Sequence, residues 1–207
     1  MTKQAGSLSH LAYLSLEREI VTLRLAPGAR VTEKQLIDLA GHGRTPVREA
    51  IQKLEWQGLI EVRPRVGLLI SEIHAEDHQE IMAVRHRLEP LAAALAAEHA
   101  SEEQRSALMR CAKAMTAAAV DGDFEGFLSS DKQFDEILED ACPNRFLIAA
   151  LAPLQTHSRR LWFARATPEK MDRSVSHHVS VIRAIQKGDA QEAQSAMEAL
   201  IGHLTAA

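Results

Sequence analysis

Aromatic side chains and cysteines are scarce in this chain. Only 4% of its 207 residues are aromatic, and it contains two cysteines, Cys111 and Cys142. These two cysteines form no metal-binding pattern, so we expect both to be free thiols. The shortage of aromatic residues, with many alanine and leucine residues, favours helices over sheets. The composition therefore predicts a mainly helical protein without a disulfide framework.

Long apolar segments are also absent. No run of about eighteen apolar residues occurs, so we expect no membrane span. The N-terminal sequence MTKQAGSLSH lacks the apolar stretch of a secretory signal. Together these absences predict a cytoplasmic protein. Apolar residues still make up 46% of the chain, enough for the core of one large domain or two small ones.

Charge is distributed unevenly along the chain. The net charge of −4 combines +3 over residues 1–70 with −7 over residues 71–207. A small basic part joined to a larger acidic part is typical of a nucleic-acid binder with a separate partner or ligand domain. Because the basic excess is modest, we expect tight DNA binding to need two copies of the basic part.

The most informative segment is residues 41–50, which read GHGRTPVREA. This segment is typical of the turn and second helix of a helix-turn-helix. Gly41 is expected to end a short helix, because glycine is common just past a helix end. Thr45 is expected to cap a second helix over residues 45–57, with Pro46 at its first position.

Basic residues gather at the start of this second helix. Arg44, Thr45 and Arg48 would lie at its positive end, where donors suit DNA phosphates and guanine edges. The opposite face is apolar and is expected to hold the helix on a small core of Val47, Ala50, Ile51 and Leu54. An ordinary helix pair with a solvated arginine face has the same spacing. The flanking segments must therefore distinguish this alternative from a DNA-binding helix-turn-helix.

The flanking segments add a family resemblance. Residues 20–33 read IVTLRLAPGARVTE and residues 54–70 read LEWQGLIEVRPRVGLLI. The first third of the chain thereby resembles the winged helix-turn-helix of the GntR family of bacterial repressors. The family's string is PG-x-x-L-x-E, a helix, G-V-S-R-T-P-V-R-E-A, then L-x-x-x-G-L-[VI]. His42 and Gly43 depart from it, and the missing hydroxyl at Gly43 predicts the loss of one phosphate contact.

The resemblance implies a DNA-binding domain over residues 1–72. Its expected elements are helices over 8–25, 32–40 and 45–57 and a hairpin, the wing, with strands over 59–62 and 67–70. A plain solvent hairpin is the alternative to a wing that reaches phosphates or the minor groove. Trp56 is expected in the core rather than stacked on a base. The expected DNA contacts are Lys34, Arg44, Thr45, Arg48, Arg63, Arg65 and Gly67.

The remainder of the chain, residues 76–207, reads as helices separated by turns. Breaks at Asp121-Gly122, Cys142-Pro143 and Gly188-Asp189 predict a bundle of six to seven antiparallel helices. The expected spans are 76–99, 102–120, 123–141, 144–166, 168–187 and 190–205. The predicted fold class is mainly α, with a winged helix-turn-helix of three helices and a small β-hairpin followed by this bundle.

The bundle resembles the FCD domain of the FadR branch of the same family. Four fragments carry this resemblance: RHRLE at residues 85–89, DKQF at residues 131–134 with Asn144 downstream, His178 followed by Gly188-Asp189, and Ala193-x-x-x-Met197. The resemblance implies an effector-binding and dimerisation domain. Because effectors of such domains are commonly small organic acids, the expected contacts are Arg85, His178 and Arg159.

Many members of that branch hold a divalent metal with one Asp and three His. Asp131 and His178 occupy two of the four positions here, whereas Asp135 and Leu200 stand where His is usual. His203, three residues past Leu200, is a displaced candidate. A site of Asp131, Asp135, His178 and His203 would suit zinc, manganese or nickel.

A metal-free cavity is the alternative to this site. Asp135 would then pair with Arg159 or Arg160, and His178 would bond the effector or a backbone carbonyl. At least one of these adjacent arginines is expected to be solvated. An arginine fork at Arg85 suits a carboxylate bidentately, although a structural pair with Glu89 is the alternative.

These patterns predict a transcriptional repressor that binds a palindromic double-stranded operator as a homodimer and responds to a small organic acid. A metal-dependent enzyme built on the bundle is the first alternative, but the chain lacks H-E-x-x-H and paired Glu-x-x-His helices. A winged-helix protein–protein interaction module is the second, and the basic residues of the second helix and the wing oppose it. We therefore expect no catalytic residues.

Overall fold

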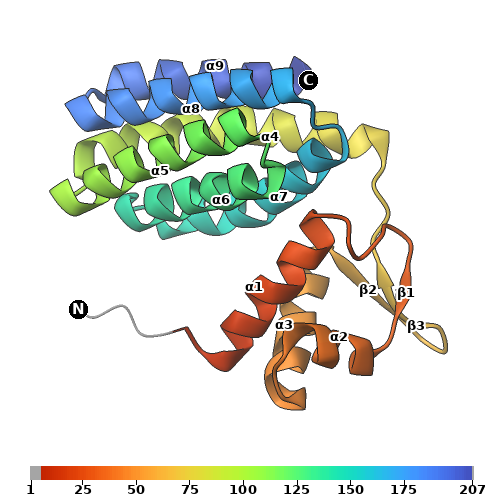
Figure 1. The fold of residues 1–207 in the computed structure, drawn as a ribbon. Coiled ribbons are helices and arrows are strands. Elements are labelled where there is room, and N and C mark those ends of the chain that lie inside the picture. The colour runs from red at the N-terminus through yellow and green to blue at the C-terminus, as the bar shows by residue number, and fades with distance from the viewer. Residues whose placement is uncertain (1–5, 207) are drawn as a thin grey trace. The chain divides into compact units, whose positions relative to one another are not determined.

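The computed structural model describes residues 6–206; residues 1–5 and 207, the outer ends of the two predicted domains, lie outside the described residues. The chain divides into two compact units, Met1–His74 and Ala75–Ala207. The described residues form nine helices and one three-stranded sheet (Figure 1), so the predicted mainly helical fold class is confirmed. Within them, no helix is long and apolar enough to span a membrane.

The described residues of the N-terminal unit form three helices and three short strands. In chain order these are α1 Leu8–Val21, β1 Arg30–Val31, α2 Glu33–Ala40, α3 Arg44–Trp56, β2 Ile60–Arg63 and β3 Gly67–Ile70. The first helix ends four residues earlier than predicted. The Thr22 hydroxyl donates to the Arg18 carbonyl at 2.7 Å, and Leu23 then takes a left-handed φ of 58°. A residue in that conformation cannot continue a right-handed helix.

The helix pair is present, but its second helix begins earlier than predicted. Gly41 ends α2 with a left-handed φ of 66°, as expected. Helix α3 then begins at Arg44, with Gly43 as its N-cap in an extended conformation. The predictions that Thr45 caps the helix and that Pro46 is its first residue were therefore wrong. Pro46 is the third residue, where its missing N–H costs nothing because first-turn amides have no intrahelical acceptor.

One face of α3 packs on the small core, as predicted. Its buried residues are Val47, Ala50, Ile51 and Leu54, which join residues of α1, α2 and the sheet. The placement of Trp56 in this core was wrong, because its side chain is 88% exposed. Trp56 follows Glu49 by seven residues, which is two helical turns, and so lies on the exposed face of α3.

The predicted hairpin forms and gains a third strand. Strands β2 and β3 are antiparallel, and β1 adds to the other edge of β3 in the order β1-β3-β2. Two-residue β1 has too little local pattern to be predicted. The wing turn is closed by a 3.1 Å bond from the Val66 amide to the Arg63 carbonyl. Arg65 takes a left-handed φ of 65° in this turn.

The C-terminal unit is a bundle of six helices that run roughly antiparallel in Figure 1. The predicted breaks are confirmed: Gly122 and Gly188 end two helices with left-handed φ values, and Cys142-Pro143 lies between two others. Both cysteines are buried free thiols, as expected. The helices are α4 Ala75–His99, α5 Glu102–Asp121, α6 Phe124–Ala141, α7 Arg145–Ala164, α8 Pro168–Lys187 and α9 Ala190–Ala206.

Candidate DNA interface and effector cavity

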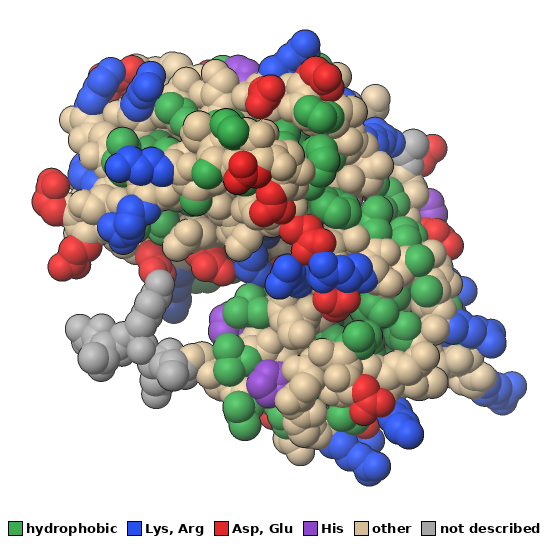
Figure 2. All heavy atoms as spheres, viewed as in Figure 1, with side chains coloured by type: hydrophobic (Ala, Val, Ile, Leu, Met, Phe, Trp, Pro, Cys, Tyr) green, Lys and Arg blue, Asp and Glu red, His purple; other side chains and the backbone are tan. Residues whose placement is uncertain are grey.

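The predicted DNA contacts are all exposed and come from three elements. Helix α2 carries one, the first turns of α3 carry three, and the wing carries three. They are Lys34, Arg44, Thr45, Arg48, Arg63, Arg65 and Gly67. Figure 2 shows basic side chains projecting from the wing and from the lower side of the N-terminal unit. Exposed cations on a helix start and an adjacent hairpin match what a DNA groove and its phosphates require.

Arg48 is held by an acidic neighbour from α2. Its Nε atom donates to Glu33 Oε1 at 2.9 Å, while 65% of the Arg48 side chain remains exposed. An arginine carries four further N–H donors on its two terminal nitrogens. The bond to Glu33 therefore limits how the Arg48 side chain can rotate and leaves its bidentate end exposed.

Arg65 stands in an unfavourable backbone conformation at the tip of the wing. Its φ of 65° places it at a turn position that glycine or asparagine normally fills. For other residues the left-handed conformation costs roughly 1–2 kcal/mol. Strain of this kind at an exposed cation favours a functional role for the side chain. The second wing arginine, Arg63, pairs with Glu61 at 2.7 Å.

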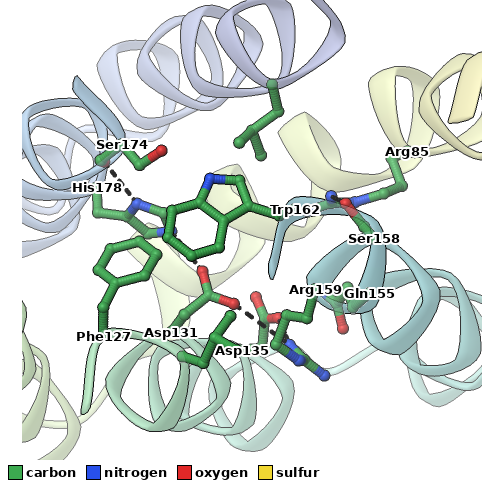
Figure 3. A pocket seen from close by; sticks show the side chains of 12 residues that line it. Arg85, Phe127, Asp131, Asp135, Gln155, Ser158, Arg159, Trp162, Ser174 and His178 are labelled. Carbon is green, nitrogen blue, oxygen red and sulfur yellow. Dashed lines mark hydrogen bonds and ion pairs between the residues drawn. The ribbon is translucent and has the colours of Figure 1, made fainter. Parts of the chain in front are cut away.

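A small cavity lies inside the bundle, between side chains from α4, α6, α7, α8 and α9 (Figure 3). Its lining residues include Arg85, Asp131, Asp135, Arg159 and His178. The helices thus bring together all the predicted effector contacts and three of the four predicted metal ligands. The free space is about 20 Å³, which is room for about one water molecule.

Two carboxylates of α6 converge on one arginine of α7. Arg159 Nη1 lies 2.5 Å from Asp135 Oδ2 and 3.6 Å from Asp131 Oδ2. Burial and the charge of Asp131 raise the pKa of Asp135 to about 8, against the opposing effect of Arg159. Asp131 and Asp135, one turn apart, therefore share a single cation, as the metal-free alternative predicted for Asp135.

His178 bonds on both sides of its ring. Its Nε2 atom lies 2.9 Å from Asp131 Oδ1, and its Nδ1 atom lies 2.7 Å from the Ser174 carbonyl. Because a carbonyl only accepts hydrogen bonds, Nδ1 carries a proton. Burial lowers the pKa of His178, but the bond to Asp131 and its charge outweigh this, and the net shift is upward. The same bond, against burial, lowers the pKa of Asp131.

Arg85 is buried and already paired. It donates from Nε to Glu89 Oε1 at 2.7 Å and from Nη2 to Glu89 Oε2 at 3.0 Å. A third bond runs from Nη1 to the hydroxyl of Ser158. The pair with Glu89, the structural alternative predicted from the sequence, is thus present. The two nitrogens of Arg85 that could hold a ligand carboxylate bidentately already bind Glu89.

Two expectations about the cavity need correction. Arg159 and Arg160 are both buried, although at least one was expected to be solvated. His203 does not complete a ligand set, because its ring stacks on His177 with centroids 5.0 Å apart. Within residues 6–206, no group of three or more His, Cys, Asp and Glu side chains is placed to hold a metal ion.

The donor chemistry of the cavity does not fit a resident metal. The guanidinium of Arg159, itself a cation, lies against both carboxylates that a metal would use. Leu200, at the usual position of the last nitrogen ligand, is buried and has no donor atom. Two carboxylates and one imidazole that already has a charged partner make a poor site for zinc, manganese or nickel.

Seven lining residues were missed by the sequence analysis, and the polar ones among them are Gln155, Ser158, Trp162 and Ser174. Trp162 lies across the middle of the cavity in Figure 3 and packs on Phe127, with ring centroids 4.7 Å apart. Ser158 and Ser174 line the wall. Trp162 Nε1 and Ser174 Oγ are buried and have no hydrogen-bond partner within residues 6–206. The available signal was the spacing of Gln155, Ser158 and Trp162, which are three and seven residues apart and so share one face of α7.

Comparisons with known proteins match both units. Residues 8–70 match the family described as bacterial regulatory proteins, gntR family, and residues 80–203 match the FCD domain. A probable D-xylose utilization operon transcriptional repressor of Paenarthrobacter nicotinovorans is 30% identical, over 86% of this chain and 79% of that protein. The HTH-type transcriptional repressor RspR of Escherichia coli is 27% identical, over 89% and 82%.

A solved structure shows the same fold. Escherichia coli McbR/YncC superimposes with a TM-score of 0.81 over 95% of this chain and 94% of that one, at 21% sequence identity. The similarity covers both units of the chain.

Proposed function

Because the chain belongs to the GntR family of bacterial regulatory proteins and carries an FCD domain, we propose that it is a repressor of the FadR branch that binds a palindromic operator as a homodimer. The family comprises transcriptional regulators rather than enzymes, which sets aside the enzyme alternative. The observation that carries the proposal is the exposed basic set at the start of α3 and in the wing.

In this proposal, Arg44, Thr45 and Arg48 read the major groove while Lys34 and the wing contact phosphates. The test begins with selection of duplexes from a random library by the full-length protein. The enriched sequence should be a palindrome with one half-site per subunit. Enrichment of a single half-site, or of no sequence, would contradict operator recognition by a dimer.

The homodimer forms through the helical unit in this proposal. Two DNA-reading units are needed because a net charge of +3 over residues 1–70 gives weak binding alone. Sedimentation equilibrium of the full chain at micromolar concentration should give twice the 22.8 kDa chain mass. A monomer at that concentration, with no association on added operator, would contradict the dimer.

The bundle cavity binds a small, carboxylate-bearing effector in this proposal, and effector binding weakens operator affinity. Arg85, Arg159 and His178 are the predicted contacts, acting through hydrogen bonds within their existing pairs.

The cavity works without a resident metal in this proposal, because Arg159 supplies the cation between Asp131 and Asp135. Elemental analysis of protein purified without chelator should then show no stoichiometric metal, and EDTA should leave the melting temperature unchanged. Near-stoichiometric metal that is absent from Asp131→Ala would contradict this.

A further inference from the structure

The basic groups inside the bundle cavity are all committed to acidic partners. Arg85 is bonded to Glu89, Arg159 to Asp135, and His178 to Asp131. An incoming carboxylate or phosphate would have to break one of these buried pairs, which is costly because the displaced acid stays in the protein interior. The inner cavity can offer hydrogen bonds to a ligand, but it is poorly suited to hold the ligand's negative charge.

A second pocket adjoins the first at Trp162. The two pockets share Ser158, Trp162 and Leu204 in their linings. We call this second pocket the outer pocket. It is lined in addition by His78, Leu161, Arg165 and Lys170, and no Asp or Glu is among the described residues of its lining. The outer pocket therefore differs in character from the inner one: the charged side chains of its lining are all basic.

We infer that the two pockets form one ligand site and that the outer pocket binds the ligand's anionic group, a carboxylate or a phosphate, at Arg165 and Lys170. This inference rests on the proposed effector-binding function of the bundle. The guanidinium of Arg165 and the ammonium of Lys170 offer charge-assisted hydrogen bonds of the kind that hold such anions. Arg165 is exposed and caps the end of α7, so an anion can reach it from solvent.

The remainder of the ligand extends inward along Trp162. The buried Nε1 atom of Trp162 and the buried hydroxyl of Ser174 have no hydrogen-bond partner in the described part of the chain. Buried donors without partners are rare and costly in folded proteins, so both favour a ligand that accepts hydrogen bonds there. The ligand class is thus a small molecule with an anionic group at one end and hydroxyl or carbonyl oxygens along its body.

Leu204 would move when such a ligand enters. It lines both pockets and lies in the last turn of α9. That turn is fastened to α4 by a 3.3 Å bond between His78 Nε2 and the Thr205 carbonyl. Because free space in each pocket is only about 20 Å³, the ligand must displace side chains such as Leu204.

The test uses the fluorescence of Trp162 in full-length protein. The chain contains two tryptophans, so Trp56→Phe leaves Trp162 as the only reporter. Inorganic phosphate and succinate are titrated separately, at constant ionic strength, into this protein and into two double variants made in it. The first is Arg165→Gln with Lys170→Gln. The second, a control with the same loss of charge, is Lys113→Gln with Arg183→Gln, two exposed residues on α5 and α8.

At least one of the two anions should give a saturable change, and the outer-pocket variant should weaken its binding by roughly tenfold or more. The control should bind within about twofold of the parent, because its charges are screened by salt. A response to phosphate alone would assign a phosphate-bearing ligand, and a response to succinate a carboxylate-bearing one. Equal weakening in both variants, or no saturable change with either anion, would overturn the inference.

Operator affinity, measured by fluorescence anisotropy on the selected duplex, separates this inference from the proposed function. If an anion binds at Arg165 and Lys170 but leaves operator affinity unchanged, anion binding by the outer pocket is supported and the proposed regulation of operator binding is contradicted. If an anion releases the operator from the outer-pocket variant as well as from the parent protein, the proposed regulation is supported and anion binding by the outer pocket is contradicted.

Discussion

The basic residues of the two units differ in how far they are exposed to solvent. Arg48, in the DNA-reading unit, is 65% exposed and shares one bond with Glu33. Arg159, in the bundle, is 10% exposed and lies between two carboxylates. An exposed ion pair contributes about 0–1 kcal/mol, so Arg48 can exchange Glu33 for DNA at little cost. Because breaking a buried pair costs much more, Arg159 stabilises the fold and Arg48 serves recognition.

The largest expected effect comes from removing the buried cation. Arg159→Met should lower the free energy of unfolding by about 3 kcal/mol, because it leaves two acids close together in the interior. The value lies at the low end for a buried pair, because the raised pKa of Asp135, about 8, lets this acid hold a proton at neutral pH. Urea denaturation measures it. Asp135→Asn in the same chain should recover part of the loss, and a single-variant loss under about 1 kcal/mol would contradict the assignment.

The second effect is on recognition by α3. Arg48→Ala should weaken operator binding by about 1–3 kcal/mol if it reads a base edge, while unfolding stays unchanged. Fluorescence anisotropy with operator and scrambled duplexes measures the first, and urea denaturation the second. A loss that is equal on both duplexes would assign Arg48 to phosphate binding rather than to base reading.

The wing arginines should act less selectively. In the double variant Arg63→Gln with Arg65→Gln, affinity should fall on every sequence, because binding to phosphates carries no sequence information. The slope of log affinity against log salt should decrease by about 1 for each phosphate that the variant no longer neutralises. An unchanged salt slope would show that the wing does not touch the DNA backbone.

A further effect concerns pH. The pKa of Asp135 is raised to about 8 from its ordinary value of 3.8. The folded protein therefore holds an extra proton between these values, and the stability that it contributes is lost as the pH rises through about 8. Thermal unfolding of the wild type should show lower stability at pH 8.5 than at pH 6. Asp135→Asn should show a smaller difference, and an equal difference would place the titration elsewhere.

Much of the fold followed from local sequence signals. Gly41, Gly122 and Gly188 end helices where predicted, because each takes a left-handed conformation that other residues disfavour. The start of α3 was predicted wrongly, because Gly43 allows the helix to begin without the side-chain cap expected from Thr45. Strand β1 was missed because its two residues pair with a strand distant in sequence.

The cavity was predictable only where the family resemblance pointed to residues. Asp131, Asp135 and His178 were named from it and are brought together. The burial of both Arg159 and Arg160 could not be predicted, because it depends on acids and helices that surround α7 in space. The roles of Trp162 and Ser174 were missed for a similar reason: the direction of a side chain in a bundle is set by packing.

The most direct test compares the affinities for the selected operator and for a scrambled duplex at physiological salt. Fluorescence anisotropy gives the ratio of these two affinities for the wild type and for Arg48→Ala. The wild type should prefer the operator by roughly 10³-fold or more. Arg48→Ala should lose at least about tenfold of that preference. Equal affinity of the wild type for the two duplexes would contradict sequence-specific repression through α3.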